Sequence, residues 1–167
     1  SLDFGRGRRE GMLISICEDS TGAIWLYTRD GELARYQNEK VDVWNLGGKG
    51  RAVIAENGLV WIGGDRALIA IDPKAVRGSA PLPVVETLPV NKLDFLLASK
   101  TGGQWRLADG AIQKWVEQRV ERNWVYPWPA GTIVTSACED EEGNLVVGTL
   151  KGNLAGGPLA EGLFLFD

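Results

Sequence analysis

The sequence has no histidine and only two cysteines among its 167 residues. Histidine is the commonest general base and the commonest metal ligand, so its absence argues against both kinds of site. Cys17 and Cys138 are too few for a disulfide framework. The sequence also lacks a catalytic triad, a cluster of metal-ligating side chains and a phosphate-binding glycine loop. We therefore predict a protein that is not an enzyme and that holds neither a metal nor a cofactor.

A basic excess and long apolar runs are missing as well. The chain carries 18 Lys and Arg against 22 Asp and Glu, a net charge of −4, which argues against a dedicated nucleic-acid-binding protein. No apolar run approaches the roughly 18 residues of a membrane span, so we expect no membrane insertion. Hydrophobic residues at 44% and charged residues at 24% are typical of a folded globular chain.

Glycine, in contrast, is abundant, at 22 of 167 residues. Four glycines stand three residues before a bulky residue: Gly22 and Trp25, Gly58 and Trp61, Gly102 and Trp105, and Gly143 and Val146. The bulky residues are 36, 44 and 41 positions apart. Around each pair the sequence shows an apolar run, a polar turn and a second apolar run. This pattern predicts two strands joined by a tight turn in which glycine supplies a positive φ.

Each repeat unit continues with a second turn and further strands. The second turns are Asp30-Gly31, Gly64-Asp65, Asp109-Gly110 and Lys151-Gly152. We expect third strands at 33–37, 67–72, 111–117 and 162–167, and fourth strands at 41–46, 82–88 and 119–126. The last unit lacks a fourth strand. Residues 2–4 resemble residues 41–44, so we expect residues 1–5 to complete it.

Four units of about 40 residues, each with four strands, predict an all-β propeller. Its antiparallel blades would span about 12–46, 51–88, 93–126 and 133–167 plus 1–5. The tryptophans after the turn glycines would then pack blade against blade. A β-sandwich of short strands is the structural alternative.

Two segments carry a resemblance to a known repeat. Residues 16–28 and 140–149 resemble the two-component-regulator propeller repeat, with an Asp-x-x-Gly turn before a bulky strand residue. Residues 30–36 match its third strand. The second and third units depart from the pattern, because Asn57 sits in a shortened turn and Ser99 stands where aspartate is expected.

The resemblance implies an extracytoplasmic (periplasmic or secreted) ligand-sensing domain of a bacterial membrane regulator, of the kind that reads products of polysaccharide breakdown. Such rings usually have about seven blades, within the known range of propellers. Four blades here leave three arrangements open: a compact ring, half of a ring completed in a homodimer, or an excerpt of a longer chain. Propellers that resemble the streptogramin lyase pair comparable repeats with a catalytic histidine, which this sequence lacks.

Charge is distributed unevenly between the two classes of predicted loop. The connections between units and the second turns should share one face and sum to about +4, whereas the first turns on the opposite face sum to −6. Clustered arginines favour carboxylate or phosphate ligands, although ordinary solvated loops are the alternative. The candidate ligand-binding cations are Arg6, Arg9, Arg29, Lys49, Arg51 and Arg66.

Aromatic residues follow the third unit on the same predicted face. Trp124, Tyr126 and Trp128 could stack on a sugar ring or contact a protein partner. The alternative is that they form an aromatic lid over the gap between adjacent blades.

The acidic first turns, Glu18-Asp19 and Glu139 to Glu142, raise the question of calcium. The ligand spacing of a calcium loop is absent, and an aspartate that binds backbone amides two residues on explains such turns. Cys17 and Cys138 occupy equivalent positions, and small apolar packing is the expected role, with a disulfide conceivable if a four-bladed ring closes.

The sequence as a whole predicts a ligand-binding or sensing module for an acidic oligosaccharide or another anion. A structural or protein-interaction module that self-assembles into a larger ring is the alternative. We expect no nucleic-acid partner.

Overall fold

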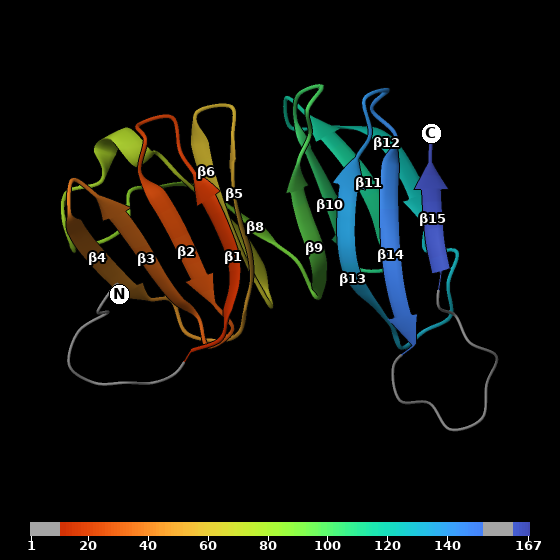
Figure 1. Ribbon diagram of the computed structural model, residues 1–167, viewed down its shortest axis with the longest axis horizontal. Helices are drawn as coiled ribbons and strands as arrows, with labels where there is room; N and C mark the ends of the chain where they lie inside the picture. The colour runs from red at the N-terminus through yellow and green to blue at the C-terminus, as the bar shows by residue number, and fades with distance from the viewer. Residues whose placement is uncertain (1–10, 152–161) are drawn as a thin grey trace. The chain divides into compact units, whose positions relative to one another are not determined.

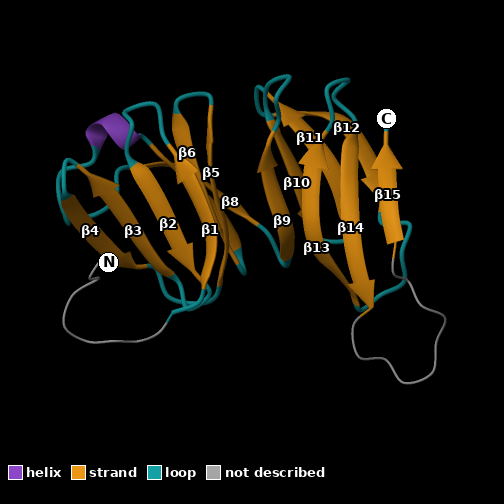
Figure 2. Ribbon diagram, viewed as in Figure 1, coloured by secondary structure: helices purple, strands orange, loops and turns teal. Residues whose placement is uncertain are grey.

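The computed structural model describes residues 11–151 and 162–167, and these residues form strands almost throughout (Figures 1 and 2). The first sheet consists of β1 (Leu13–Glu18), β2 (Ile24–Thr28), β3 (Glu32–Gln37) and β4 (Lys40–Asn45). The second consists of β5 (Gly50–Glu56), β6 (Leu59–Gly64), β7 (Ala67–Ile71) and β8 (Val84–Pro89), with the short 3-10 helix η1 (Pro73–Ala75) before β8.

The remaining strands form two more sheets. The third consists of β9 (Leu93–Ala98), β10 (Gln104–Ala108), β11 (Ala111–Val116) and β12 (Arg119–Val125). The fourth consists of β13 (Thr132–Glu139), β14 (Leu145–Lys151) and β15 (Gly162–Phe166). Within the described part of the chain, no helix is long and apolar enough to cross a membrane.

Each sheet pairs strands that follow one another in the chain, and every pairing is antiparallel. This order is that of propeller blades and not of a sandwich, in which strands alternate between two sheets. The predicted all-β propeller fold is confirmed. We call the sheets blades 1 to 4. The described residues give blade 4 three strands, and the strand predicted at residues 1–5 lies outside them.

The described residues divide into two compact units, each containing two blades. Unit 1 comprises residues 11–91 with blades 1 and 2, and unit 2 comprises residues 92–151 and 162–167 with blades 3 and 4. In unit 1, Trp25, Tyr27 and Leu33 of blade 1 share a buried cluster with Val53 and Ile62 of blade 2.

Unit 2 repeats this packing. Trp105, Leu107 and Ile112 of blade 3 share a cluster with Val147 and Phe166 of blade 4. The expected role of Trp25 and Trp105 between blades is therefore confirmed. Large aromatic side chains suit this role because each removes on the order of 200 Å² from water.

The first turns of all four blades contain a glycine in the left-handed region, as the repeat predicts. Their φ angles are 77° at Gly22, 76° at Gly58, 96° at Gly102 and 85° at Gly143. Most other residues would be strained at these positive φ angles, so the spacing of the glycines reflects the positions of the turns.

Carboxylates hold the turns of blades 1 and 4. Asp19 Oδ1 accepts hydrogen bonds from the amides of Thr21 at 2.7 Å and Ala23 at 3.2 Å, and Asp19 Oδ2 accepts one from the Trp25 indole at 2.7 Å. Asp140 Oδ1 accepts hydrogen bonds from the amides of Glu142 and Asn144 at 2.9 and 2.8 Å. The turn-stabilising interpretation of these aspartates is confirmed. Among the described residues, no cluster of three acidic or cysteine side chains could hold a metal ion.

Candidate functional site

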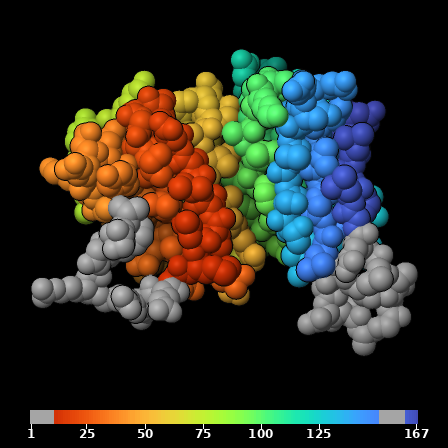
Figure 3. All heavy atoms as spheres, in the orientation of Figure 1, coloured from red at the N-terminus to blue at the C-terminus, as the bar shows by residue number. Residues whose placement is uncertain are grey.

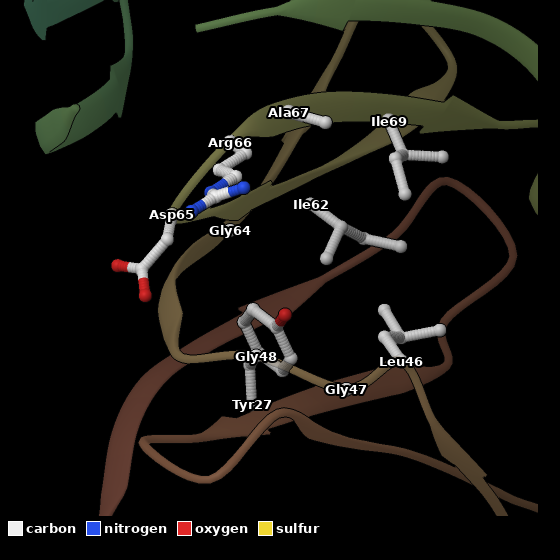
Figure 4. A pocket seen from close by; sticks show the side chains of 10 residues that line it. All are labelled: Tyr27, Leu46, Gly47, Gly48, Ile62, Gly64, Asp65, Arg66, Ala67 and Ile69. Atoms are coloured by element: carbon white, nitrogen blue, oxygen red, sulfur yellow. The ribbon is translucent and has the colours of Figure 1, made fainter. Parts of the chain in front are cut away.

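A pocket of about 520 Å³ opens between blades 1 and 2 at one end of unit 1 (Figure 4). Three segments line it: Tyr27 on β2, the connection from β4 to β5, and the β6–β7 turn with its flanking strands. The lining residues are Tyr27, Leu46, Gly47, Gly48, Ile62, Gly64, Asp65, Arg66, Ala67 and Ile69. The connection between blades and the second turn of blade 2 thus share one end of unit 1, as the propeller pattern predicts.

Glycine at two positions lets the β4–β5 connection lie close against blade 1. The amide of Leu46 donates to the Gly31 carbonyl at 2.9 Å, and the amide of Gly50 donates to the Arg29 carbonyl at 2.9 Å. A Cβ at Gly31 would come within 2.7 Å of the Gly47 carbonyl oxygen, and one at Gly50 within 2.1 Å of the Thr28 carbonyl oxygen. Any side chain there would push the connection away from the mouth of the pocket.

The pocket has an apolar wall and a polar edge. Leu46, Ile62 and Ile69 point into it, together with the ring of Tyr27 (Figure 4). Burial and the charge of Asp65 raise the pKa of Tyr27, so its hydroxyl stays protonated at neutral pH. The site therefore offers a neutral hydroxyl beside an apolar surface.

The predicted cations are placed differently from one another around this pocket. Arg66 lines it, is exposed, and makes no ion pair with any residue that the structure describes. Arg51 does not line it, and its Nε donates to Asp65 Oδ1 at 2.9 Å. Lys49 and Arg29 are exposed on neighbouring turns. Among the predicted cations that the structure describes, Arg66 is thus the one that lines the pocket and forms no ion pair with a described residue.

Two predicted residues fall outside this description. Arg6 and Arg9 lie outside the described residues, so their predicted role is neither supported nor opposed.

The predicted aromatic residues lie in unit 2, where all three pack. Trp128 is 7% exposed, and its ring centroid lies 4.7 Å from that of Tyr126 and 5.0 Å from that of Phe164. Trp124 stacks on Trp105 at 6.0 Å. This arrangement matches the lid over a blade gap that the sequence left open as an alternative. Sugar stacking by these residues stays a prediction.

The hydroxyl of Tyr126 is also engaged. It donates to Asp94 Oδ2 at 3.0 Å, and Asp94 Oδ1 accepts Lys92 Nζ at 2.8 Å. Burial and the negative charges of Asp94 and Asp109 raise the pKa of Tyr126 well above its ordinary value. The phenol is therefore a permanent donor that anchors the lid to blade 3.

The sequence pattern did not point to Tyr27, Leu46, Ile62 or Ile69. Each lies on a strand or a connection whose apolar residues are expected in a core, so nothing local distinguishes a pocket wall from packing. One signal was available: Gly47-Gly48 stands in the connection where the equivalent part of unit 2 has Pro127-Trp128.

The structure is similar to several solved proteins. Over 99% of this chain and 22% of the other, it matches the extracellular domain of a putative hybrid two-component system from B. thetaiotaomicron, with a TM-score of 0.64 and 15% identity. The two share a fold. The resemblance to the two-component-regulator repeat, first visible in the turns, is confirmed at that level.

Two further solved structures are similar to this chain over most of its length. Streptogramin B lyase matches with a TM-score of 0.64 and 12% identity, over 95% of this chain and 55% of the lyase. YCF48 from Cyanidioschyzon merolae matches with a TM-score of 0.60 and 11% identity, over 97% and 52%. The chain thus spans between about a fifth and just over half of these proteins. No protein-family model and no curated protein sequence matches the chain.

Proposed function

We propose that this chain is a non-catalytic binding or sensing module whose pocket between blades 1 and 2 takes a small anionic ligand. The observation that carries the proposal is the position of Arg66, an exposed guanidinium without an ion-pair partner among the described residues, at the edge of an open pocket. Guanidinium groups bind carboxylate and phosphate through paired hydrogen bonds. The volume of about 520 Å³ lies within the range of small-molecule sites.

The character of the wall favours one kind of anion over another. An acidic oligosaccharide needs many hydrogen-bonding groups and an exposed aromatic platform, whereas Leu46, Ile62 and Ile69 offer only aliphatic surface. An anion with an apolar body fits this lining better. The single carboxylate in the lining, Asp65, is bound by Arg51, which supports a binding role and not acid–base chemistry.

A calorimetric screen of small carboxylates and phosphates against the protein tests the proposal. Binding should weaken by roughly tenfold in Arg66→Gln, since a hydrogen bond to a charged group is lost. The matched control is Arg29→Gln, an exposed arginine on a neighbouring turn that does not line the pocket. Equal affinity in wild type and Arg66→Gln for every anion that binds would reject this site.

A second candidate function, self-assembly into a larger ring, is favoured by two exposed blade faces. Val53 of blade 2 pairs with Ile62 and is 1% exposed, whereas Ile16, at the same position of blade 1, pairs with Leu26 and is 60% exposed. On β15, Leu163 is 78% exposed. Both β1 and β15 lie open at the surface of their units (Figure 3). Exposed apolar side chains of this kind are typical of interaction surfaces.

Sedimentation at several protein concentrations distinguishes this second candidate. A self-assembling chain should form dimers or larger species that revert to monomers in Ile16→Glu, with Val43→Glu, on the same face of blade 1, as a second probe. A monomer at the highest concentration would reject it.

A further inference from the structure

The connections between blades begin in the same way in units 1 and 2, although that of unit 2, residues 126–131, is two residues longer than that of unit 1, residues 46–49. The amide of Leu46 donates to the Gly31 carbonyl at 2.9 Å, and the amide of Tyr126 donates to the Gly110 carbonyl at 2.8 Å. Leu46 and Tyr126 therefore occupy equivalent positions, each directly after the fourth strand's last residues. Two residues further on, unit 1 has Gly48 where unit 2 has Trp128.

In unit 2, Trp128 fills the gap between its blades. Its ring lies against Tyr126 and Phe164, at centroid distances of 4.7 and 5.0 Å, in a cluster that also contains Leu107 and Val147. The space that an indole occupies there is closed, since Trp128 is 7% exposed.

The strand registers place the lining of the unit 1 pocket at the positions around Trp128. Tyr27 pairs with Leu33 as Leu107 pairs with Ile112, and Ile62 pairs with Ile69 as Val147 pairs with Phe164. Four pocket residues therefore match four residues of the cluster around Trp128. In order, Tyr27, Leu46, Ile62 and Ile69 match Leu107, Tyr126, Val147 and Phe164.

From this equivalence we infer that the unit 1 pocket is a binding site for the aromatic ring of a small aromatic carboxylate. The inference rests on the proposed function and names its ligand class. The ring takes the place that Trp128 takes in unit 2, because Gly48 has no side chain to fill it. A planar ring packs against the partly exposed side chains of Leu46 and Ile69, which lie over Tyr27 and Ile62.

The polar edge determines where the carboxylate goes. Arg66 and the protonated hydroxyl of Tyr27 are groups that can donate hydrogen bonds to a carboxylate, whereas Asp65 repels an anion and is bound by Arg51 at 2.9 Å. The carboxylate therefore lies on the Arg66 side of the ring. The volume of about 520 Å³ leaves room for this substituent beside the ring.

Calorimetry with three probes, indoleacetate, cyclohexylacetate and acetate, tests the ring and the charge separately. Indoleacetate should bind at least tenfold more tightly than cyclohexylacetate, and acetate should bind more weakly than either. Ile69→Trp, which fills the pocket from the position equivalent to Phe164, should abolish indoleacetate binding, and Lys40→Gln, an exposed lysine of blade 1 that does not line the pocket, serves as the surface control. Equal affinity for indoleacetate and cyclohexylacetate, or binding that survives in Ile69→Trp, overturns the inference.

A measurement on the unaltered protein keeps the inference falsifiable if Ile69→Trp does not fold. Ring currents of a bound indole shift the methyl NMR signals of Ile62 and Ile69, whereas cyclohexylacetate has no ring current. Methyl signals that stay in place when indoleacetate saturates the protein overturn the inference. The experiments distinguish failure of this inference from failure of the proposed function. If a non-aromatic anion binds and its binding depends on Arg66, the proposed function stands and only the aromatic ligand class is rejected.

Discussion

The carboxylate of Glu139 in blade 4 accepts a hydrogen bond of 3.2 Å from the indole nitrogen of Trp105 in blade 3. In blade 1 the same bond is made within one turn, from Trp25 to Asp19 at 2.7 Å. Blade 3 has Ser99 in place of that aspartate, and Ser99 Oγ donates to Glu139 Oε1 at 2.8 Å. A neighbouring blade thus supplies the carboxylate that the turn of blade 3 lacks.

Replacing Glu139 with glutamine should destabilise unit 2. Glu139 and Lys114 are each 4% exposed, with Lys114 Nζ 3.8 Å from Glu139 Oε1, so the substitution removes the buried counter-charge of Lys114 and leaves only the exposed Glu121, at 3.7 Å. The expected loss is about 3 kcal/mol, measured by denaturant unfolding. Glu18→Gln is the matched control, because Glu18 holds the same repeat position and is exposed. Equal losses in the two variants would contradict this account.

An aspartate at position 99 should recover part of that loss. The amide of Asp19 donates to the Ala23 carbonyl, and the amide of Ser99 donates to the Gly103 carbonyl, each at 2.9 Å, so the two residues hold equivalent turn positions. Ser99→Asp therefore places a carboxylate in the turn of blade 3. The double variant Ser99→Asp with Glu139→Gln should be more stable than Glu139→Gln alone. In the presence of Glu139, Ser99→Asp should instead destabilise the protein, since two carboxylates then share one site. The four unfolding midpoints form a double-mutant cycle, and additive effects would refute the replacement.

The stability of the protein should fall in acid because the carboxylates of Asp19 and Glu139 become protonated. Burial raises the pKa of Asp19 and of Glu139, but hydrogen bonds from the turns, the indoles and, for Glu139, the charge of Lys114 outweigh it, so both pKa values lie below their ordinary ranges. A lowered folded-state pKa adds stability that is fully present above the unfolded-state pKa and is lost as the pH falls through the folded value. Unfolding midpoints should therefore decline below about pH 4, where an unfolded carboxyl takes up its proton. A variant with both Asp19→Asn and Glu139→Gln should show a flatter acid profile, and an unchanged slope would contradict the assignment.

Removing the Trp128 side chain should open in unit 2 a cavity like the pocket of unit 1. Trp128→Gly copies Gly48 and should cost about 3–5 kcal/mol of unfolding free energy, as large-to-small core substitutions do. Free indole should raise the melting temperature of this variant by more than that of the wild type, because apolar cavities bind ligands of matching shape. Thermal unfolding with and without indole measures both effects, and Trp115→Gly provides a control outside the Trp128 cluster. Absence of a differential response to indole would show that the cavity collapses.

The two free thiols should react at very different rates. Burial, followed by the negative charge of Asp19, raises the pKa of Cys17 to about 12, whereas Cys138 is exposed. Because the thiolate is the reactive form, iodoacetamide at about pH 8 should modify Cys138 first and Cys17 only on unfolding. Peptide mass spectrometry over time measures the order, with Cys138→Ser as the control that leaves one thiol. Rapid labelling of Cys17 in the folded protein would contradict its burial.

Much of the fold was predictable because its signals are local. Gly22 and Asp19 both act within one hairpin: the glycine forms the turn, and the aspartate binds backbone amides a few residues away. Their roles can therefore be predicted from the local sequence. The fourth strands expected at 41–46 and 82–88 lie at 40–45 and 84–89. Such shifts of one or two residues arise where strand ends depend on cross-strand pairing.

The candidate site was predictable only in part. Sorting loops by their place in the repeat placed Arg66 at the end of unit 1 where the pocket lies. The repeat pattern did not predict the ion pair between Asp65 and Arg51, because these residues are 14 positions apart in the sequence. Nor did it show that Trp128 is buried, because an aromatic residue beside prolines in a loop is compatible with either a lid or an exposed platform.

The sequence by itself determined the repeat, the strands, the left-handed turns and the aspartates that hold them, because each depends on residues a few positions apart. Only the tertiary structure decided which blade supplies the carboxylate for Trp105 and which blade gap is filled. Glu139 and Trp105 are 34 positions apart and meet through the packing of blades, for which no local pattern exists. The absence of histidine and the excess of glycine were visible from the start, but the importance of Gly48 emerged only when Trp128 was seen in the equivalent position.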